Sequence, residues 1–259
     1  MRSTTVASNG IEIAYETFGA PGGRPLLLVM GLGAQMLAWH PELYAALAAE
    51  DFFVVRYDDA IGLLDALGRD RAHVVGASLG GMIAQTIAIM HPKRVRSLTS
   101  IMSTPWGGIG WWSPTPAAQA ALSAPLPTSR AEMVERTVAM QKAIGSPGYP
   151  MDEAWVREVA GQSYDRGFDP TGLERQALAV YASGDRTVAL AHVTAPALVV
   201  HGEADPVVQL PAGQATAAAL PDAELLVLPG TGHDVPREIW PTLVTAISRL
   251  ADRAEALHN

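Results

Sequence analysis

The sequence predicts an α/β protein: a mostly parallel, doubly wound sheet with an N-terminal antiparallel hairpin and a helical cap insertion. Three observations predict this class. Strand-sized apolar runs alternate with helical patterns along most of the 259 residues. An Asn-Gly pair at residues 9–10 separates two segments of alternating polarity, which is the strongest short-range signal for a hairpin. Residues 104–185 carry polar helical patterns without a convincing strand, and we interpret them as an insertion that covers the sheet.

The first half of the chain supplies most of the predicted sheet. Residues 4–18 form the hairpin, and residues 26–30 are apolar on both faces, as in a buried parallel strand. Leucines and alanines within residues 39–50 line one face of a helix. The same patterns predict further strands at residues 52–57, 72–75 and 95–101, and helices at residues 60–67 and from the turn after residue 75 to about residue 91.

The second half of the chain contains the insertion and completes the sheet. Within the insertion we expect helices at residues 130–144, 151–163 and 172–183. After it, the patterns predict strands at residues 197–202 and 224–228 and helices at residues 209–220 and 236–257. The chain is therefore expected to divide into an α/β core of residues 1–103 and 186–259 and a helical cap of residues 104–185.

Composition narrows the classes of protein that remain. A chain of this length that is 49% hydrophobic can bury the core of one large α/β domain. The net charge of −8 argues against nucleic acid as a partner. No apolar run reaches the roughly 18 residues of a membrane span, and the first residues contain no apolar signal core. Because cysteine is absent, a cytoplasmic location is expected. The oligomeric state stays open.

A strand, a sharp turn and a helix meet at residues 74–82, and the turn contains the G-x-S-x-G sequence of residues 76–80. In a nucleophile elbow this motif places a serine, here Ser78, at a strained tip. The neighbouring backbones must approach closely, which favours glycine at positions 76 and 80. The following helix directs free N–H groups toward an anion beside the serine. We therefore predict Ser78 as a nucleophile.

A serine hydroxyl needs a base within hydrogen-bond reach, and that base needs an orienting acid. His233 follows the last predicted strand, and Asp205 follows the strand before it. Both belong to the sheet edge at which parallel strands end and ligands bind. The order Ser78, Asp205, His233 is also the order stated for α/β-hydrolases. We interpret the neighbouring Asp234 as a loop or helix-cap residue, and His201 as a residue that packs or hydrogen-bonds beneath the acid loop.

A tetrahedral oxyanion needs N–H donors held in place. One donor is expected from the backbone of Leu79, directly after the nucleophile, and the other from Leu32 in the glycine-rich loop after the strand of residues 26–30. No histidine pair or carboxylate cluster has metal-ligand spacing, so neither a metal nor another cofactor is implied.

With these residues assigned, the chain resembles the α/β-hydrolase superfamily over nearly its whole length, and within it the branch of aclacinomycin methylesterase and related esterases. The matching segments are residues 26–31, 55–58, 71–81 and 199–206. Most of the superfamily has His-Gly where this chain has Met30-Gly31, and the methylesterase branch shares the methionine. The resemblance implies a serine hydrolase that uses the three residues above without a cofactor and cleaves a methyl ester or another carboxylic ester.

Other functions remain compatible with the sequence. The same three residues could serve a C–C hydrolase, a lactonase or a cofactor-free perhydrolase. The chain could also be a ligand-binding protein that kept the fold with an idle triad, because fold alone does not decide function. A serine at the elbow argues against dehalogenase and epoxide-hydrolase chemistry, which uses a carboxylate there. The natural substrate and its acyl group are not specified by the sequence.

Three tryptophans follow the point at which the chain leaves the sheet. Trp106, Trp111 and Trp112 are separated by glycines, which allow many backbone conformations. We predict that at least one of them lines an apolar cleft near Ser78 and that the substrate is a bulky, largely apolar or aromatic small molecule. The alternative is that they only pack the cap onto the core.

The link between the strand of residues 52–57 and the next strand is short. A parallel crossover needs about a dozen residues or more, and residues 58–71 barely meet that length. The related hydrolases have a longer passage here, and a βαβ unit has about 30 residues or more. We therefore predict that roughly 25–40 residues are missing at or beside Asp58 and Asp59, where they are either deleted or disordered and skipped by continuous numbering.

Overall fold

The computed structural model describes residues 4–8, 10–57, 62–106 and 113–257. These residues form an eight-stranded sheet in the order β1-β2-β4-β3-β5-β6-β7-β8. The first two strands pair antiparallel with each other, and β2 pairs antiparallel with β4, whereas the remaining neighbours are parallel. The strands are β1 (Thr4–Ser8), β2 (Ile11–Phe18), β3 (Arg24–Val29), β4 (Phe52–Tyr57), β5 (Ala72–Ala77), β6 (Val95–Ile101), β7 (Ala197–Gly202) and β8 (Ala223–Leu228). The predicted fold class is confirmed.

The strand order reverses beside β3, and this reversal fixes where a ligand can bind. The chain runs from β3 outward to β4 and then crosses back over β3 to β5. Ligands of open α/β sheets bind beyond the carboxyl ends of the strands at such a switch point. The loops that follow β3 and β5 meet here, and those after β7 and β8 end at the same edge.

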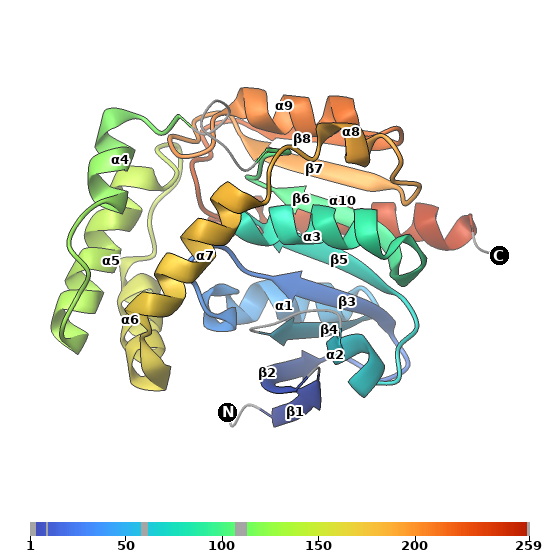
Figure 1. Ribbon diagram of the computed structural model, residues 1–259, viewed down its shortest axis with the longest axis horizontal. Coiled ribbons are helices and arrows are strands. Elements are labelled where there is room, and N and C mark those ends of the chain that lie inside the picture. Colours follow the sequence, from blue (N-terminus) through green and yellow to red (C-terminus); the bar gives the residue numbers. More distant parts are fainter. Residues whose placement is uncertain (1–3, 9, 58–61, 107–112, 258–259) are drawn as a thin grey trace.

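Two layers of helices cover the sheet because the central strands are apolar on both faces. Leu26 and Leu28 of β3 pack in one cluster with residues of α1 (Pro41–Ala49) and α10 (Trp240–Ala256). Leu27 and Val29 point the other way and pack with residues of α2 (Gly62–Ala66) and α3 (Leu79–Met90). The same face also carries α8 (Thr187–Leu190) and α9 (Leu210–Ala219). Figure 1 shows α3 in front of the strands, with α1 and α10 behind them.

The helices of the insertion stand together at one end of the sheet (Figure 1). They are α4 (Pro116–Leu122), α5 (Arg130–Ile144), α6 (Glu153–Gly167) and α7 (Pro170–Ala182). The two ends of the insertion meet, since Trp106 forms an isolated antiparallel bridge with Asp185 and the Arg186 N–H donates to the Pro105 carbonyl at 2.9 Å. The division into core and cap at residues 104 and 185 stays a prediction.

Several helix boundaries differ from those predicted. The short helices α4 and α8 were not expected, because one or two turns carry too little periodicity to be recognised. The last helix begins at Trp240 and not at Pro236, because Arg237–Ile239 form a separate 3₁₀ turn. In the described part of the chain, no helix combines the length and the apolar character that a membrane crossing requires.

Candidate active site

Ser78 occupies the sharp turn between β5 and α3 in a strained backbone conformation. Its φ of 56° and ψ of −120° are unusual for a residue with a side chain. The glycines at either side leave the room that this turn needs. A Cβ atom on Gly76 would lie 2.0 Å from the Gly80 carbonyl oxygen, and a Cβ atom on Gly80 would lie 2.2 Å from that of Val29. The geometry is therefore that of the elbow predicted from the motif.

Hydrogen bonds from the neighbouring strand fix the backbone of Ser78. Its N–H donates to the Ile101 carbonyl at 2.9 Å. Its carbonyl accepts from the Ser103 hydroxyl at 2.8 Å and from the Gly81 N–H at 2.9 Å. Ser103 was not singled out from the sequence, because a serine just after a strand has no local signature of such a contact. The turn is thus held from both sides.

The structure brings the three predicted side chains together. His233 lies in the loop after β8, and its Nε2 is 3.0 Å from the Ser78 hydroxyl. Its Nδ1 is 2.8 Å from a carboxylate oxygen of Asp205. Because a carboxylate only accepts, Nδ1 donates to Asp205, and Nε2 is left to accept from Ser78. The Asp205 side chain is fully buried and that of His233 is 11% exposed, so a substrate could reach the outer end of this chain of hydrogen bonds.

Asp205 is oriented by its own loop. Its second oxygen accepts from the N–H groups of Val207 and Val208 at 2.8 and 2.9 Å. Beneath it, Nε2 of the fully buried His201 lies 2.6 Å from the Val208 carbonyl, as the sequence predicted for this histidine. Burial lowers the pKa of His201 despite the hydrogen bond to Val208 and the nearby Asp205, so the ring is neutral at pH 7 and donates from Nε2. Asp205 therefore has His233, and not His201, as its hydrogen-bonded histidine.

Of the two predicted oxyanion donors, Leu79 adjoins the nucleophile in sequence, and Leu32 follows a residue that lies close to it in space. Leu79 is the first residue of α3, where a helix leaves its N–H groups without partners inside the helix. Leu32 follows Gly31, whose Cβ position would be 3.6 Å from the Ser78 hydroxyl oxygen. Within the described residues, the N–H groups of Leu32 and Leu79 donate to no protein acceptor. Both are therefore free to bind an anion.

The tryptophan prediction is tested only in part by the described residues. Trp106 is half-buried at the base of the insertion, where its backbone pairs with Asp185 and its N–H donates to the Thr104 hydroxyl at 3.3 Å. Trp111 and Trp112 lie outside the described residues. A role of these tryptophans in substrate binding stays a prediction.

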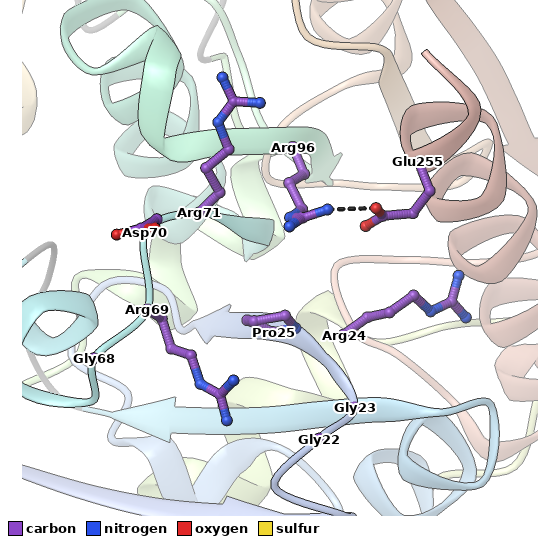
Figure 2. A pocket seen from close by; sticks show the side chains of 10 residues that line it. All are labelled: Gly22, Gly23, Arg24, Pro25, Gly68, Arg69, Asp70, Arg71, Arg96 and Glu255. Atoms are coloured by element: carbon purple, nitrogen blue, oxygen red, sulfur yellow. Dashed lines mark hydrogen bonds and ion pairs between the residues drawn. The ribbon is translucent and has the colours of Figure 1, made fainter. Parts of the chain in front are cut away.

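Another hollow lies at the opposite edge of the sheet, near the amino ends of β3 and β5. It measures about 370 Å³ and is lined by Arg24, Arg69, Arg71 and Arg96 together with Asp70 and Glu255. Figure 2 shows the arginine heads pointing in different directions, with Arg96 paired to Glu255. The other three each bind a carbonyl or carboxylate elsewhere. Because these heads do not converge, the hollow is no rival to the site around Ser78.

Comparisons with known proteins agree with this geometry. A model of the α/β-hydrolase fold family matches residues 57–236, which is more than half of the chain. The chain therefore belongs to the α/β-hydrolase fold family, and the resemblance seen in its motifs is confirmed. Family and relatives together identify it as a hydrolase.

Among its relatives is rhodomycin D methylesterase DauP from Streptomyces sp. (strain C5), with 26% identity over 95% of this chain and 97% of that protein. The 2-(acetamidomethylene)succinate hydrolase of Mesorhizobium japonicum is 32% identical over 75% of this chain and 69% of that protein. Among solved structures, esterase RhEst1 from Rhodococcus sp. ECU1013 superposes with a TM-score of 0.78 at 23% identity, covering 96% of this chain and 100% of that chain.

The match to DauP also bears on chain length. It spans 295 aligned positions, 36 more than the 259 residues of this chain, so that protein carries residues without a counterpart here. The predicted site of a missing segment, at Asp58 and Asp59, lies outside the described residues. The prediction that roughly 25–40 residues are missing at this point therefore stays a prediction.

Proposed function

We propose that the protein is a serine hydrolase that cleaves a carboxylic ester through an acyl-enzyme intermediate. One observation carries the proposal: the continuous chain of hydrogen bonds from Ser78 through His233 to Asp205. Nucleophile and base at 3.0 Å, with the base held by an acid at 2.8 Å, meet the geometric requirement for activating a serine.

In the first half-reaction, Ser78 Oγ attacks the ester carbonyl carbon while His233 Nε2 takes the hydroxyl proton. The oxyanion that forms accepts from the N–H groups of Leu32 and Leu79, and each such donor contributes about 2.7–4 kcal/mol. Collapse of the tetrahedral intermediate breaks the ester C–O bond. The proton on His233 passes to the leaving oxygen, which departs as the alcohol. Asp205 stabilises the transient imidazolium without taking its proton.

In the second half-reaction, water replaces the alcohol. His233 removes a proton from water as it attacks the acyl carbon of acylated Ser78. Collapse of the second intermediate returns that proton to Ser78 and releases the carboxylic acid. No cofactor takes part in either half-reaction.

The substrate we propose is a methyl ester, or another carboxylic ester, of a bulky apolar or aromatic small molecule. A methylesterase among the relatives supports the ester class. The tryptophans of residues 106–112 support a bulky apolar group. We also propose a cytoplasmic location, because a chain without cysteine is suited to a reducing compartment.

The test is the release of p-nitrophenol from p-nitrophenyl esters, with a burst equal to the enzyme concentration, and covalent labelling of Ser78 by a fluorophosphonate. Ser78→Ala and His233→Ala should each lower kcat by on the order of a million-fold, as in a serine protease triad. Ser129→Ala is the matched control, because it removes the hydroxyl of a serine in the predicted cap that is distant in sequence from Ser78. A protein that binds the esters without releasing alcohol would be the non-catalytic alternative, and cleavage of C–C substrates alone would favour that hydrolase class.

A further inference from the structure

The loop that carries His233 is bound to the cap by its backbone. The His233 N–H donates to the Ile144 carbonyl at 2.8 Å, at the end of α5. Two residues of the α5–α6 connection approach the loop so closely that glycine is required. A Cβ atom on Gly232 would lie 2.3 Å from the Gly145 carbonyl oxygen, and the Gly148 N–H donates to the Gly230 carbonyl at 2.9 Å.

Side chains strengthen this junction through the hydroxyl of Ser146. It accepts from the Gly232 N–H at 2.9 Å and donates to a carboxylate oxygen of Asp234. The other carboxylate oxygen of Asp234 accepts from the side-chain amide of Gln141, in the last turn of α5, at 3.0 Å. We call Gln141, Ser146 and Asp234 the cap clamp. Its hydrogen bonds involve Gly232 and Asp234, the residues directly before and after His233 in the sequence.

Asp234 is a half-buried carboxylate that the proposed reaction does not use. His233 Nδ1 binds Asp205 and not its neighbour Asp234. Burial raises the pKa of Asp234, while its hydrogen bonds from Ser146 and Gln141 and the nearby His233 act in the opposite direction. A carboxylate in such surroundings costs free energy unless its partners are well placed. We therefore infer the role of Asp234 from the residues that it binds, Gln141 and Ser146.

We propose that Asp234 and Ser146 are positioning residues that fix the loop of residues 230–234 against the cap and so keep Nε2 of His233 within reach of Ser78. This inference rests on the proposed function. The base must stay within about 2.6–3.2 Å of the hydroxyl, and a displacement of about 1 Å can cost about a hundredfold in rate. Loops move more readily than strands, so a base carried on a loop needs an external support.

Substitutions that break the cap clamp do not create a cavity in the hydrophobic core. Asp234, Ser146 and Gln141 border a hollow of about 360 Å³ that also touches Ala204 and Pro206, the two neighbours of Asp205. Removing a hydroxyl at the edge of this hollow leaves the core clusters untouched. The clamp variants are therefore expected to fold.

The experiment compares Ser146→Ala and Asp234→Ala with Ser129→Ala. Ser129 caps the opposite end of α5, where its hydroxyl accepts from the Glu132 N–H, so the control removes a serine hydroxyl from the same helix far from His233. The readouts are kcat and KM for a p-nitrophenyl ester, the rate at which a fluorophosphonate labels Ser78, and the melting temperature.

Ser146→Ala and Asp234→Ala should each lower kcat and the labelling rate about tenfold, corresponding to one or two lost hydrogen bonds, with KM nearly unchanged. Ser129→Ala should lower the melting temperature and leave both rates unchanged. Ser146→Thr restores the hydroxyl and should restore the rates. If Ser146→Ala does not fold, Asp234→Ala decides the question by the same readouts.

Equal kcat and labelling rates in wild type, Ser146→Ala and Asp234→Ala would overturn the proposed positioning role. A change in KM alone, or a fall in kcat that parallels the fall in melting temperature, would overturn it as well. These outcomes differ from failure of the proposed function itself, in which the wild-type protein neither becomes labelled at Ser78 nor releases alcohol.

Discussion

At the scale of single residues, the site depends on a serine that the chain holds in an unfavourable conformation. A backbone like that of Ser78 costs about 1–3 kcal/mol and persists only where its surroundings determine it fully. Here they do so through close approaches that only glycine allows and through the hydrogen bonds of Ser78 with Ile101 and Ser103. The strain is therefore compensated by packing beneath the nucleophile.

Gly80→Ala tests this compensation. The new methyl group would meet the backbone of Val29, which cannot move without disturbing β3. We expect a loss of at least about 2 kcal/mol in the free energy of unfolding, measured by urea denaturation, together with loss of ester hydrolysis. Gly22→Ala is the control, since nothing lies within 4 Å of its Cβ position and its φ is ordinary. Equal stability of the two variants would contradict the argument.

Ser78, Asp205 and His233 could be predicted from the sequence because each has a local signal. Ser78 lies in a motif, Asp205 follows the end of a strand, and His233 lies in a loop with neighbouring glycines. The cap clamp has no such signal. Ser146 and Asp234 are 88 residues apart, and their contact exists only because the cap folds back onto the last loop of the sheet. Pairings of this kind depend on tertiary packing, which composition and spacing do not encode locally.

At the scale of elements, helices were predictable where both their ends were marked. The predicted limits of α5 coincide with those observed, since Ser129 caps its first turn and Gly145 follows its last. In contrast, α2 has only five described residues and lies beside the short link after β4. The strands β4, β6 and β7 also match their predicted limits. Continuous apolar residues at 52–55 and 197–200 mark β4 and β7.

The helix α7 of the insertion should open before α10 of the core. It contains no buried residue, whereas α10 contains nine. The Gln176 side chain of α7 accepts from the Gly33 N–H of the core at 2.9 Å, next to Leu32. Helices with so few buried contacts unfold locally at low free-energy cost. In hydrogen–deuterium exchange, amides of α7 should exchange well before those of α10, and equal protection would refute this.

At the scale of the whole molecule, stability should depend on pH through His73, on the strand before Ser78. This buried ring lies against Phe52, and its nitrogens contact Ser97 and Glu255. Burial, aided by Arg24 and Arg96 and opposed by Glu255, lowers its pKa from 6.5 to about 4.

The unfolded chain therefore binds a proton on this histidine at a pH where the folded protein does not. The stabilisation is complete above pH 6.5 and is lost as the pH falls toward about 4, a total of about 3 kcal/mol. His73→Gln should remove this part of the acid sensitivity. Urea denaturation of wild type and His73→Gln between pH 7 and pH 4 tests this prediction. The difference between their free energies of unfolding should shrink by about 3 kcal/mol over this range, and a constant difference would contradict the lowered pKa of His73.

The two ends of the insertion meet where Trp106 pairs with Asp185, so both ends of the predicted cap lie at one place on the sheet. A different cap could be grafted between these two points without changing the path of any strand. The graft would nevertheless not be neutral. The loop that carries His233, the base of the proposed triad, is hydrogen-bonded to Ile144 and Ser146 of the insertion. A foreign cap without equivalent hydrogen bonds would leave Ser78 in place but would no longer hold His233 beside it. Exchange of substrate range by cap swapping would then require the donor to bring its own α5–α6 connection.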